Sequence, residues 1–539
     1  MPERNIIMDA VLDLKIVEQK SSNRASSSAP RNSQTKIVAT VGPACDGEEK
    51  LAELITAGVD VFRLNMAHAD HRQQDVRLAA IRAAAAKAGR TVGVLVDLAG
   101  PKMRLGELPD GQLLCRTGER VRFVRGDAES GPAVTTEGPS GAMIPTTATT
   151  PELTTTYEPL IDELRPDDRI MLADGTVCLL VERVDKDSAV CRVLQAGLIR
   201  SRQGVNLPGV KLSVAAMSDL DRENAVWAAE NEIDFVGLSF VRRADDVREL
   251  KALLKASVRD SNSGGPNVIA KIEKPEALDD LTAIVASADG VMVARGDLGV
   301  EIDIAQVAVA QKRIIAECRR QRKPVIIATQ MLDSMQRSRI PTRAEVADVS
   351  NAILDGGDAC MLSGETAVGE YPRETVEIMN RIALAAETLL ASHVEDAAPN
   401  CRDENCPKQH RWTYSHPLNP VTRAVVSGAG TLAEQLAAKL IIVASASGAT
   451  ALSLAKSRFR VPTVGVSNSA ATLRRLCLYW GVTPLADAPL GNSPALARFV
   501  TDWGKQNGML RAGDHIVLIT GTAGAAVTKH NMIVVHEVE

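Results

Sequence analysis

Two short apolar runs of this chain end in charged side chains, and these are the residues best suited to chemistry. One run ends in Lys271 and Glu273, and the next ends in Arg295 and Asp297. Runs rich in Val and Ile are typical of strands buried on both faces of a parallel sheet. If these strands are neighbours, their carboxyl ends place two carboxylates beside a Lys and an Arg. Carboxylates can hold a divalent cation and the basic groups an anion, which predicts chemistry on a phosphate.

The strands that would carry these residues belong to a regular alternation of strand-like and helical runs. Helical patterns such as 78–88 and 305–322 separate most of the strand-like runs. This alternation indicates parallel βαβ units, and eight of them favour a closed (β/α)₈ TIM barrel. An open doubly wound sheet is the alternative, but polar residues end nearly every strand rather than those at one switch point. The expected strands are 36–42, 61–66, 92–98, 235–240, 268–273, 291–295, 325–330 and 359–365.

One interval between strands is far longer than a βα loop needs. Between 98 and 235 the chain carries short alternating runs punctuated by Gly, Asp and Pro, which are typical of antiparallel strands. We expect residues 105–207 to form a small β-barrel domain inserted after the third strand, at the catalytic end of the barrel. A domain placed there can act as a lid that excludes water. Its expected strands are 120–124, 169–172, 177–181 and 189–193.

The two ends of the chain differ in composition from the barrel, which is itself expected over 34–104 and 208–390. Residues 1–33 end in a polar, Ser-rich stretch and are expected to form a flexible N-terminal extension. Residues 391–411 carry charges, Pro and Cys, which suits a linker. Residues 412–539 return to an α/β pattern and predict a separate C-terminal domain with strands at 440–444, 463–466, 515–520 and 532–537.

The composition of the 539 residues argues against several classes of protein. A net charge of −5 gives no basic footprint, and 3% aromatic residues offer few platforms for stacked bases, so we expect no nucleic-acid partner. No apolar run approaches the roughly 20 residues that cross a membrane. The first residues lack the apolar core of a secretion signal. Nine scattered Cys without a regular framework predict reduced thiols in a cytoplasmic protein.

Four sequence strings lie at the ends of expected strands: Lys-Ile-Glu at 271–273, Met-Val-Ala-Arg-Gly-Asp-Leu-Gly at 292–299, Ala-Thr-Gln-Met-Leu at 328–332 and Leu-Ser-Gly-Glu-Thr-Ala at 362–367. They resemble the corresponding strings of the pyruvate kinase family. Each string alone could be a surface pair, a turn or a helix cap. Their order and their place at successive strand ends favour the family, and the resemblance runs from about residue 35 to the C-terminus.

The resemblance implies transfer of phosphoryl from phosphoenolpyruvate to ADP in the last step of glycolysis, with protonation of the enolate to pyruvate. It implies that Glu273 and Asp297 hold Mg²⁺ or Mn²⁺, that Lys271 and Arg63 neutralise the phosphoryl group, and that Thr329 aids protonation of the enolate. The implied substrate-binding residues are Ala294, Arg295, Gly296, Asp297, Thr329 and Ser239. The implied nucleotide-binding residues are Pro43, Arg63, His68 and Arg104.

The monovalent-cation site, which the family commonly builds from Asn, Ser and Asp, is altered here. Asn65 and Asp97 are present, but Ala67 takes the Ser position, and a methyl group cannot ligate K⁺. The family's Asp-Thr-Lys-Gly-Pro-Glu is Asp-Leu-Ala-Gly-Pro-Lys here, so Lys102 replaces the Glu and resembles the K⁺-independent branch. An ammonium tethered near Asp97 would supply the charge of a bound K⁺, which predicts activity without added K⁺. The alternative is that Lys102 points to solvent and K⁺ still binds through carbonyls.

Two further segments depart from the family or concern regulation. In the inserted domain Gln203 replaces a Lys that usually meets nucleotide phosphates, and Arg202 is a candidate substitute. In the C-terminal domain a loop between a strand and a helix joins small hydroxyl residues to backbone N–H groups, which can bind an anion. The resemblance implies a phosphorylated allosteric effector at that loop, and a turn with a Ser/Thr cap is the alternative. The implied effector-binding residues are Ser445, Ser447, Gly448 and Thr450.

The remaining expectations concern the linker and the assembly. Cys401, Cys406, His410 and His416 offer four candidate zinc ligands, but zinc spacing usually has a longer loop between the pairs, so an irregular linker is preferred. The resemblance also implies a homotetramer with contacts through the barrel and the C-terminal domain.

Two other functions stay open at this point. A barrel lyase acting on pyruvate or oxaloacetate would also pair Glu and Asp around Mg²⁺, but it would not need the inserted domain. A metabolite-sensing protein that has lost catalysis is the other, and the retention of Lys271, Glu273, Asp297 and Thr329 argues against it.

Overall fold

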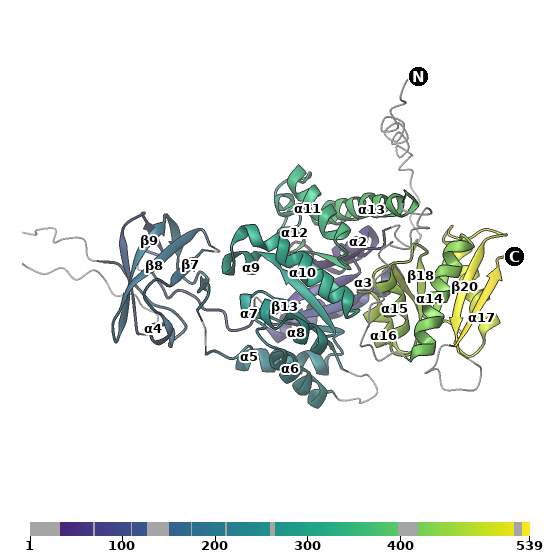
Figure 1. Cartoon of the computed structure of the whole chain (residues 1–539), viewed down its shortest axis with the longest axis horizontal. Helices are drawn as coiled ribbons and strands as arrows, with labels where there is room; N and C mark the ends of the chain where they lie inside the picture. The colour runs from purple at the N-terminus through teal and green to yellow at the C-terminus, as the bar shows by residue number, and fades with distance from the viewer. Residues whose placement is uncertain are drawn as a thin grey trace, which may run out of the picture.

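The structure is a computed structural model that describes most of the chain. It covers residues 33–67, 70–108, 110–126, 150–173, 175–210, 213–258, 265–396, 419–521 and 531–539. Three parts lie in a row: an inserted β domain, a central barrel and a C-terminal α/β domain (Figure 1).

The central part is a closed barrel of eight parallel strands, which confirms the predicted fold class. Strands that follow one another in the chain are neighbours in the barrel. The inserted domain lies between β3 and β12 in the chain, and these two strands are still paired in the barrel. The strands are short, rich in Val, Ile and Ala, and almost wholly buried, as parallel strands covered by helices must be. They are β1 (Lys36–Thr40), β2 (Val61–Asn65), β3 (Gly93–Asp97), β12 (Phe235–Leu238), β13 (Asn267–Ile272), β14 (Gly290–Ala294), β15 (Val325–Ala328) and β16 (Ala359–Leu362).

Helices cover the barrel, and several begin at side chains that accept hydrogen bonds from the first turn. The Ser218 and Thr342 hydroxyls each form a capping box, with Asp221 and Glu345 respectively. The longer covering helices are α2 (Glu48–Ala57), α3 (His71–Ala88), α5 (Asp219–Glu230), α6 (Ala244–Ser257), α10 (Val307–Arg320), α11 (Arg343–Leu354) and α13 (Pro372–Asp396). The shorter ones are α7 (Pro275–Asp279), α8 (Leu281–Ser287), α9 (Arg295–Glu301), η2 (Ile304–Gln306), η3 (Asp333–Gln336) and α12 (Gly364–Ala367).

The inserted domain has its own hydrophobic core, built on Phe123, Ile170 and Val181 among others. Its strands form a six-stranded sheet, in the order β11-β7-β8-β9-β5-β6, and a two-stranded sheet of β10 and β4. All pairs are antiparallel except β5 with the two-residue β6. The elements are β4 (Gln112–Cys115), β5 (Arg120–Val124), β6 (Glu152–Leu153), α4 (Leu160–Glu163), β7 (Arg169–Leu172), β8 (Val177–Val184), β9 (Ser188–Gln195), β10 (Gly197–Arg200) and β11 (Val205–Asn206).

The C-terminal domain is a five-stranded sheet in the order β19-β18-β17-β20-β21, parallel except for β21. The four predicted strands have the predicted limits: β17 (Leu440–Ala444), β18 (Thr463–Val466), β20 (His515–Thr520) and β21 (Met532–Glu537). The prediction missed β19 (Val482–Leu485), whose Pro484 weakens a strand pattern and fits only an edge. The helices are α14 (Pro420–Gln435), α15 (Ala449–Ser457), α16 (Ala470–Leu476) and α17 (Ser493–Gln506).

An aspartate immediately precedes every second strand of the barrel, at the end opposite the predicted active site. Each carboxylate accepts a hydrogen bond of 2.8–2.9 Å from a backbone N–H of the preceding strand. The backbone N–H of each aspartate donates in return to the carbonyl of the residue on the preceding strand whose N–H its carboxylate accepts, at 2.9–3.3 Å. Each carboxylate also meets a cation. This repeated contact fixes the register of alternate strand pairs; its residues are Asp60, Asp234, Asp289 and Asp358.

The same end of the barrel is where the C-terminal domain docks. Asp358 accepts from Lys456 at 2.6 Å and from Arg458 at 3.0 Å, and Asp234 accepts from Arg474 at 2.7 Å. Apolar side chains from the barrel interior and from α14–α16 form one continuous core there. The ionic contacts and this shared core join the two domains.

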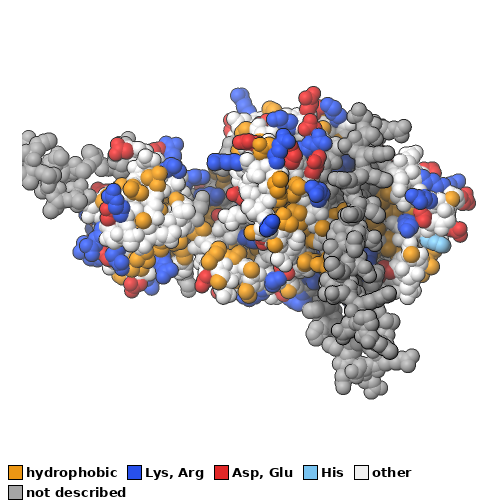
Figure 2. Space-filling view, turned by 90° about the horizontal axis from the view of Figure 1, so that it is seen from above, with side chains coloured by type: hydrophobic (Ala, Val, Ile, Leu, Met, Phe, Trp, Pro, Cys, Tyr) orange, Lys and Arg blue, Asp and Glu red, His pale blue; other side chains and the backbone are white. Residues whose placement is uncertain are grey.

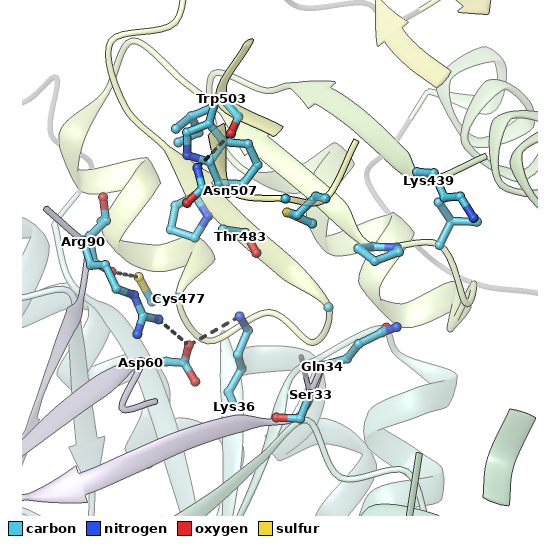
Figure 3. Close-up of a pocket in the computed structure, with 18 of the residues that line it drawn as sticks. Ser33, Gln34, Lys36, Asp60, Arg90, Lys439, Cys477, Thr483, Trp503 and Asn507 are labelled. Atoms are coloured by element: carbon cyan, nitrogen blue, oxygen red, sulfur yellow. Dashed lines mark hydrogen bonds and ion pairs between the residues drawn. The ribbon is translucent and has the colours of Figure 1, made fainter. Parts of the chain in front are cut away.

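A cavity of 1410 Å³ lies beside this junction, between the starts of β1–β3 and the edge strand β19. Asp60 lies close to both Lys36 and Arg90 on the floor of the cavity, and Trp503 of α17 and Asn507, just after α17, line the opposite wall (Figure 3). The Lys36 ammonium also donates to the Val482 carbonyl at 2.7 Å. Asp60 therefore links the barrel to the C-terminal domain through Lys36.

Three general properties follow from the described part of the chain. Its seven cysteines are all buried and free. None of its helices combines the length and the apolar character that crossing a membrane requires. Acidic and basic side chains are interspersed on the face of the barrel seen in Figure 2.

We expect Asp358→Asn to destabilise the junction strongly. Asn keeps an acceptor for the Val325 N–H but leaves Lys456 and Arg458 without a counter-charge, and Lys456 is only 1% exposed. Removing one partner of a buried ion pair costs about 3–5 kcal/mol. Burial already lowers the pKa of Lys456, and Asp358 opposes that shift. The check is the midpoint of urea unfolding.

Asp289→Asn is the matched control, because it changes the equivalent aspartate where the partner, Lys251, is 35% exposed. Its loss should be about 1 kcal/mol or less. Equal shifts for the two variants would contradict the prediction.

Candidate active site

Lys271 is the centre of a charged cluster at the carboxyl end of the barrel strands. The side chain rises from β13 and is 8% exposed. Its ammonium lies 2.8 Å from Glu273 Oε1 and 3.2 Å from Asp97 Oδ1, and it donates to Ser239 Oγ at 2.6 Å. Burial alone would lower the pKa of Lys271, but Asp97 and Glu273 outweigh burial and hold that pKa above its usual range. Lys271 is thus a fixed positive charge.

Asp97 joins this ammonium to a second cation. Arg63 of β2 donates from Nε to Asp97 Oδ2 at 2.7 Å, and its Nη2 lies 2.6 Å from the same oxygen. Arg63 Nη1 also donates to Thr40 Oγ1 at 3.1 Å. Burial alone would raise the pKa of Asp97, but Lys271 and Arg63 hold that pKa below its usual range. Three strand ends therefore place two cations side by side, which suits an anionic group.

Glu273 and Asp297 are the predicted metal ligands. Glu273 is 1% exposed, and its Oε2 accepts from the Phe240 N–H at 2.9 Å. Its Oε1 is buried without a hydrogen bond of good geometry, although Lys271 is near. Burial raises the pKa of Glu273 and Asp297 adds to that shift, while Lys271 opposes it.

These residues fit a divalent cation. Asp297 is half-buried, and its carboxylate makes no hydrogen bond or ion pair within the described residues. With Lys271, Arg63, Asp97 and Glu273 it leaves one net negative charge, which a divalent cation would overcome. No group of three or more His, Cys, Asp and Glu side chains that could hold a metal ion occurs in the described ranges, so protein ligands here are limited to one or two carboxylates. One or two carboxylates, with substrate oxygens and water completing the shell, is the usual protein set for Mg²⁺.

Thr329 and the start of α9 form the next part of the rim. The Gly296 N–H donates to Thr329 Oγ1 at 2.7 Å, and that hydroxyl donates to the Ala328 carbonyl at 2.7 Å. The Arg295 side chain does not reach into the cluster, since its guanidinium binds the Thr329 carbonyl and Asp348. Ala294 and Gly296 contribute backbone at this rim, where α9 begins. Ser239 is 1% exposed and donates to the Leu98 carbonyl at 2.7 Å while it accepts from Lys271.

A small cleft of 70 Å³ opens between this rim and the inserted domain. Asp297, Lys274 and Lys102 line it from the barrel, and Asn206 lines it from the insert. The larger cavity at the other end of the barrel is not lined by Glu273 or Asp297, so the candidate active site is the smaller cleft.

In the altered monovalent site, Asn65 and Asp97 are partners in the register of β2 and β3, whereas Lys102 lines the cleft. Asn65 Oδ1 accepts from the Ala67 N–H at 3.1 Å. The cations in contact with Asp97, within the described segments, are Arg63 and Lys271. Lys102 is exposed on the cleft, and its side chain makes no hydrogen bond or ion pair with a described residue. The ammonium beside Asp97 in this structure is that of Lys271.

The nucleotide-side residues are spread around the entrance. Pro43 is exposed in the loop after β1, and His68 lies outside the described residues. Arg104 stands in the neck of the insert, where its Nη1 donates to the Arg202 carbonyl at 3.1 Å. Arg202 itself pairs with Glu107, and Gln203 Oε1 accepts from the Arg200 N–H at 2.7 Å. Arg202 and Gln203 thus both make their side-chain contacts within the inserted domain.

The other predicted sites stand as follows. Ser445 and Thr450 are buried, Ser447 is exposed, and Gly448 has a φ of 81°, which favours glycine. Ser445, Ser447 and Gly448 lie between β17 and α15, and Thr450 lies in the first turn of α15. Cys401, Cys406, His410 and His416 lie outside the described residues.

Sequence reasoning missed the residues that hold the cluster in place. Thr40 receives Arg63, and the Phe240 backbone, at a φ of 56°, supports Glu273. Gly100 makes room for Phe240: a Cβ on Gly100 would lie 2.4 Å from the Phe240 ring, at a φ of 69°. The Gly-Pro turn after Asp97 was the available signal, because glycine marks close backbone approach.

Comparison with known proteins agrees with this geometry. A family model described as the pyruvate kinase barrel domain matches residues 32–376, and one described as the pyruvate kinase alpha/beta domain matches residues 423–536. The chain belongs to the pyruvate kinase family. The resemblance seen at the strand ends is thereby confirmed, and because the family consists of phosphotransferases, the chain is an enzyme of that class.

Individual relatives within the pyruvate kinase family cover nearly the whole chain. Pyruvate kinase 2 of a Synechocystis strain is 40% identical over 95% of this chain and 80% of its own length. Pyruvate kinase of Mycobacterium intracellulare is 36% identical over 93% of this chain and 98% of its own length. A crystal structure of a pyruvate kinase from Cryptosporidium parvum superposes with a TM-score of 0.79 at 30% identity, covering 94% of this chain and 96% of that one.

We expect Gly100→Ala to disrupt the cluster. The new methyl group would clash with the Phe240 ring, which must move, and the Phe240 N–H would then lose its place against Glu273. A displacement of about 1 Å near reacting groups can cost on the order of 100-fold, so kcat/KM should fall at least about tenfold.

Gly111→Ala is the matched control, since Gly111 has the same φ of 69° but nothing within 4 Å of its would-be Cβ. Both variants bear the same backbone strain, so thermal unfolding separates strain from the clash. A loss of kcat/KM in Gly111→Ala as large as in Gly100→Ala would refute the prediction.

Proposed function

We propose that this chain transfers the phosphoryl group of phosphoenolpyruvate to ADP and releases pyruvate and ATP. The observation that carries the proposal is the buried contact of Lys271 with both Asp97 and Glu273, beside Arg63, at one rim of a closed barrel. It brings two fixed cations to one place with Glu273, one of the two acids that we assign to the metal, as transfer of a phosphoryl group requires. A barrel lyase is disfavoured because an inserted domain faces this rim.

The cations act by charge and position. Phosphoryl transfer develops charge on the three non-bridging oxygens of the moving group, and preorganised cations stabilise that charge without reorganising. Asp97 holds the side chains of Lys271 and Arg63 in place before substrate binds, so binding incurs no further entropy cost for ordering them. Arg63 presents a planar fork that suits a phosphoryl group. ADP would enter past Pro43, His68 and Arg104.

Mg²⁺ or Mn²⁺ held by Glu273 and Asp297 would supply Lewis-acid stabilisation to the carboxylate and enolate oxygens of the substrate. The buried Glu273 carboxylate and the Asp297 carboxylate, which makes no hydrogen bond or ion pair within the described residues, support this assignment. The backbone of 294–297 would orient the substrate carboxylate. Thr329 would assist delivery of a proton to the enolate carbon through its hydroxyl.

The finer parts of the proposal concern K⁺ and regulation. Ala67 removes a ligand of the monovalent site, and Lys271 already neutralises Asp97, which supports activity without K⁺. The loop of Ser445, Ser447, Gly448 and Thr450 would bind a phosphorylated effector. The shared core and the contacts of Asp234 and Asp358 support transmission from that domain to the barrel.

The domain limits and the assembly complete the proposal. Hydrogen bonds between Leu105 and Gln203 and between Met103 and Val205 close the neck of the insert, which supports limits at 104 and 207. Membership of the family supports a homotetramer, in which subunit contacts would cover large apolar side chains exposed on η2, α10 and the edge strand β21. They include Ile304, Val309 and Val535, which are 76%, 59% and 42% exposed. We place the enzyme in the cytoplasm.

We expect Glu273→Gln to weaken binding of Mn²⁺ at least about tenfold, because a neutral amide replaces a carboxylate ligand. Titration of Mn²⁺ followed by electron paramagnetic resonance measures this without turnover. Asp279→Asn, which removes an exposed carboxylate on α7, should leave Mn²⁺ affinity unchanged. Equal affinity in Glu273→Gln and the parent would remove Glu273 from the metal site.

We expect the pyruvate-forming rate at fixed ionic strength to change by less than about twofold when K⁺ replaces a large organic cation. The double variant Ala67→Ser, Lys102→Glu restores the family's ligand and charge pattern and should gain K⁺ dependence. A lactate-dehydrogenase-coupled assay reports both. Strong K⁺ activation of the parent would contradict the expectation, and absence of ADP-dependent pyruvate formation under all conditions would refute the function itself.

A further inference from the structure

Thr329 and Gln330, at the end of β15, both adopt the left-handed backbone conformation. Their φ angles are 69° and 54°. This conformation is uncommon outside glycine, and for a β-branched residue such as Thr it is a true outlier. Strained residues of this kind persist only where their surroundings over-determine them, and they cluster at functional sites. The question is which contacts hold this pair.

Contacts from the neighbouring strand end hold the Thr329 backbone and hydroxyl. The Gly296 N–H donates to Thr329 Oγ1 at 2.7 Å, and the hydroxyl donates to the Ala328 carbonyl at 2.7 Å. Arg295 Nη2 donates to the Thr329 carbonyl at 2.9 Å. The Arg295 contact therefore ties the carbonyl of this strained residue to the neighbouring strand end.

Arg295 is in turn fixed by a residue of α11. Its Nη1 donates to Asp348 Oδ1 at 2.7 Å, and it lies 3.4 Å from Gln311 Oε1. The Arg295 side chain is 10% exposed and that of Asp348 is 41% exposed. Arg carries a planar fork, so one acid on one side aligns the donor on the other side.

We propose that Asp348, acting through Arg295, is a positioning residue that holds Thr329 in the left-handed turn from which its hydroxyl serves the enolate. The inference rests on the proposed function, and it adds a residue on a covering helix that no strand-end motif contains. Asp348 does not touch the substrate; it aligns the guanidinium that binds the Thr329 carbonyl.

The step affected is protonation of the enolate. The carbon–carbon π pair takes up one proton at the methylene carbon, the enolate oxygen becomes the carbonyl oxygen, and water replaces the proton that the hydroxyl delivers. Charge stabilisation of the phosphoryl group by Lys271 and Arg63 does not pass through Asp348. Loss of Asp348 should therefore reduce turnover and proton exchange together while substrate affinity changes little.

The test uses the full-length enzyme with the variants Asp348→Asn, Asp348→Glu, Arg295→Lys and Glu370→Gln. Glu370 is the control: it is an exposed carboxylate after α12 whose side chain makes no hydrogen bond or ion pair with a described residue. Two readouts are measured, kcat and KM for phosphoenolpyruvate, and uptake of deuterium into the methyl group of pyruvate by NMR in D₂O with ATP and Mg²⁺. Thermal unfolding of each variant accompanies them.

We expect Asp348→Asn and Arg295→Lys to slow both turnover and deuterium uptake by about tenfold, with KM within about twofold of the parent. Asp348→Glu should recover part of both rates because it retains the carboxylate. If Asp348→Asn does not fold, the rates of Asp348→Glu relative to the parent test the proposal instead. Rates in Asp348→Asn within twofold of Glu370→Gln would overturn the proposal, as would a raised KM with deuterium uptake unchanged. A parent enzyme that forms no pyruvate would instead refute the proposed function.

Discussion

The burial of the Lys271 ammonium is the constraint on which the site depends. A charge that is 8% exposed is tolerated only with close counter-charges, and here these come from Asp97 on β3 and Glu273 beyond β13. Asp97 is buried still more deeply and is paired with Arg63 from β2 as well. Strands β3 and β13 lie on either side of β12 in the closed barrel, and the insert separates β3 from both of them in the chain. The site is therefore assembled only when the barrel forms.

The opposite end of the barrel obeys the same rule with the signs reversed. There the buried groups are aspartates, each satisfied by a backbone N–H of the preceding strand and by a cation. For Asp358 and Asp234 that cation belongs to the C-terminal domain. Burial raises the pKa of Asp234, against the opposing effect of Arg474, so that contact requires the domain to stay docked. A movement of the C-terminal domain therefore bears on strand register in the barrel.

Much of the fold could be predicted because it depends on local pattern. Val- and Ile-rich runs of four to six residues, separated by helices, identified all eight barrel strands. The edge strand β19 was missed, since Pro484 hides it and its pairing with β18 is the only sign of it. Lys271 and Glu273 share one strand end, so their meeting was visible in the sequence. The contact of Asp97 with Lys271 was not, because the two are separated by the whole inserted domain and Lys102 was the cation nearer in sequence.

The residues that sequence reasoning found and those it missed differ in their physical role. Groups aimed at a substrate must stand at strand ends, where types and spacing are restricted, so motifs record them. Groups that hold them in place need only reach them, and they can come from any covering element. Asp348 is on α11, more than 50 residues from Arg295 in the chain, and its carboxylate is one of many on helix surfaces. Only coordinates reveal that this one aligns the guanidinium behind a strained threonine, which is why supporting contacts of this kind must be read from structure.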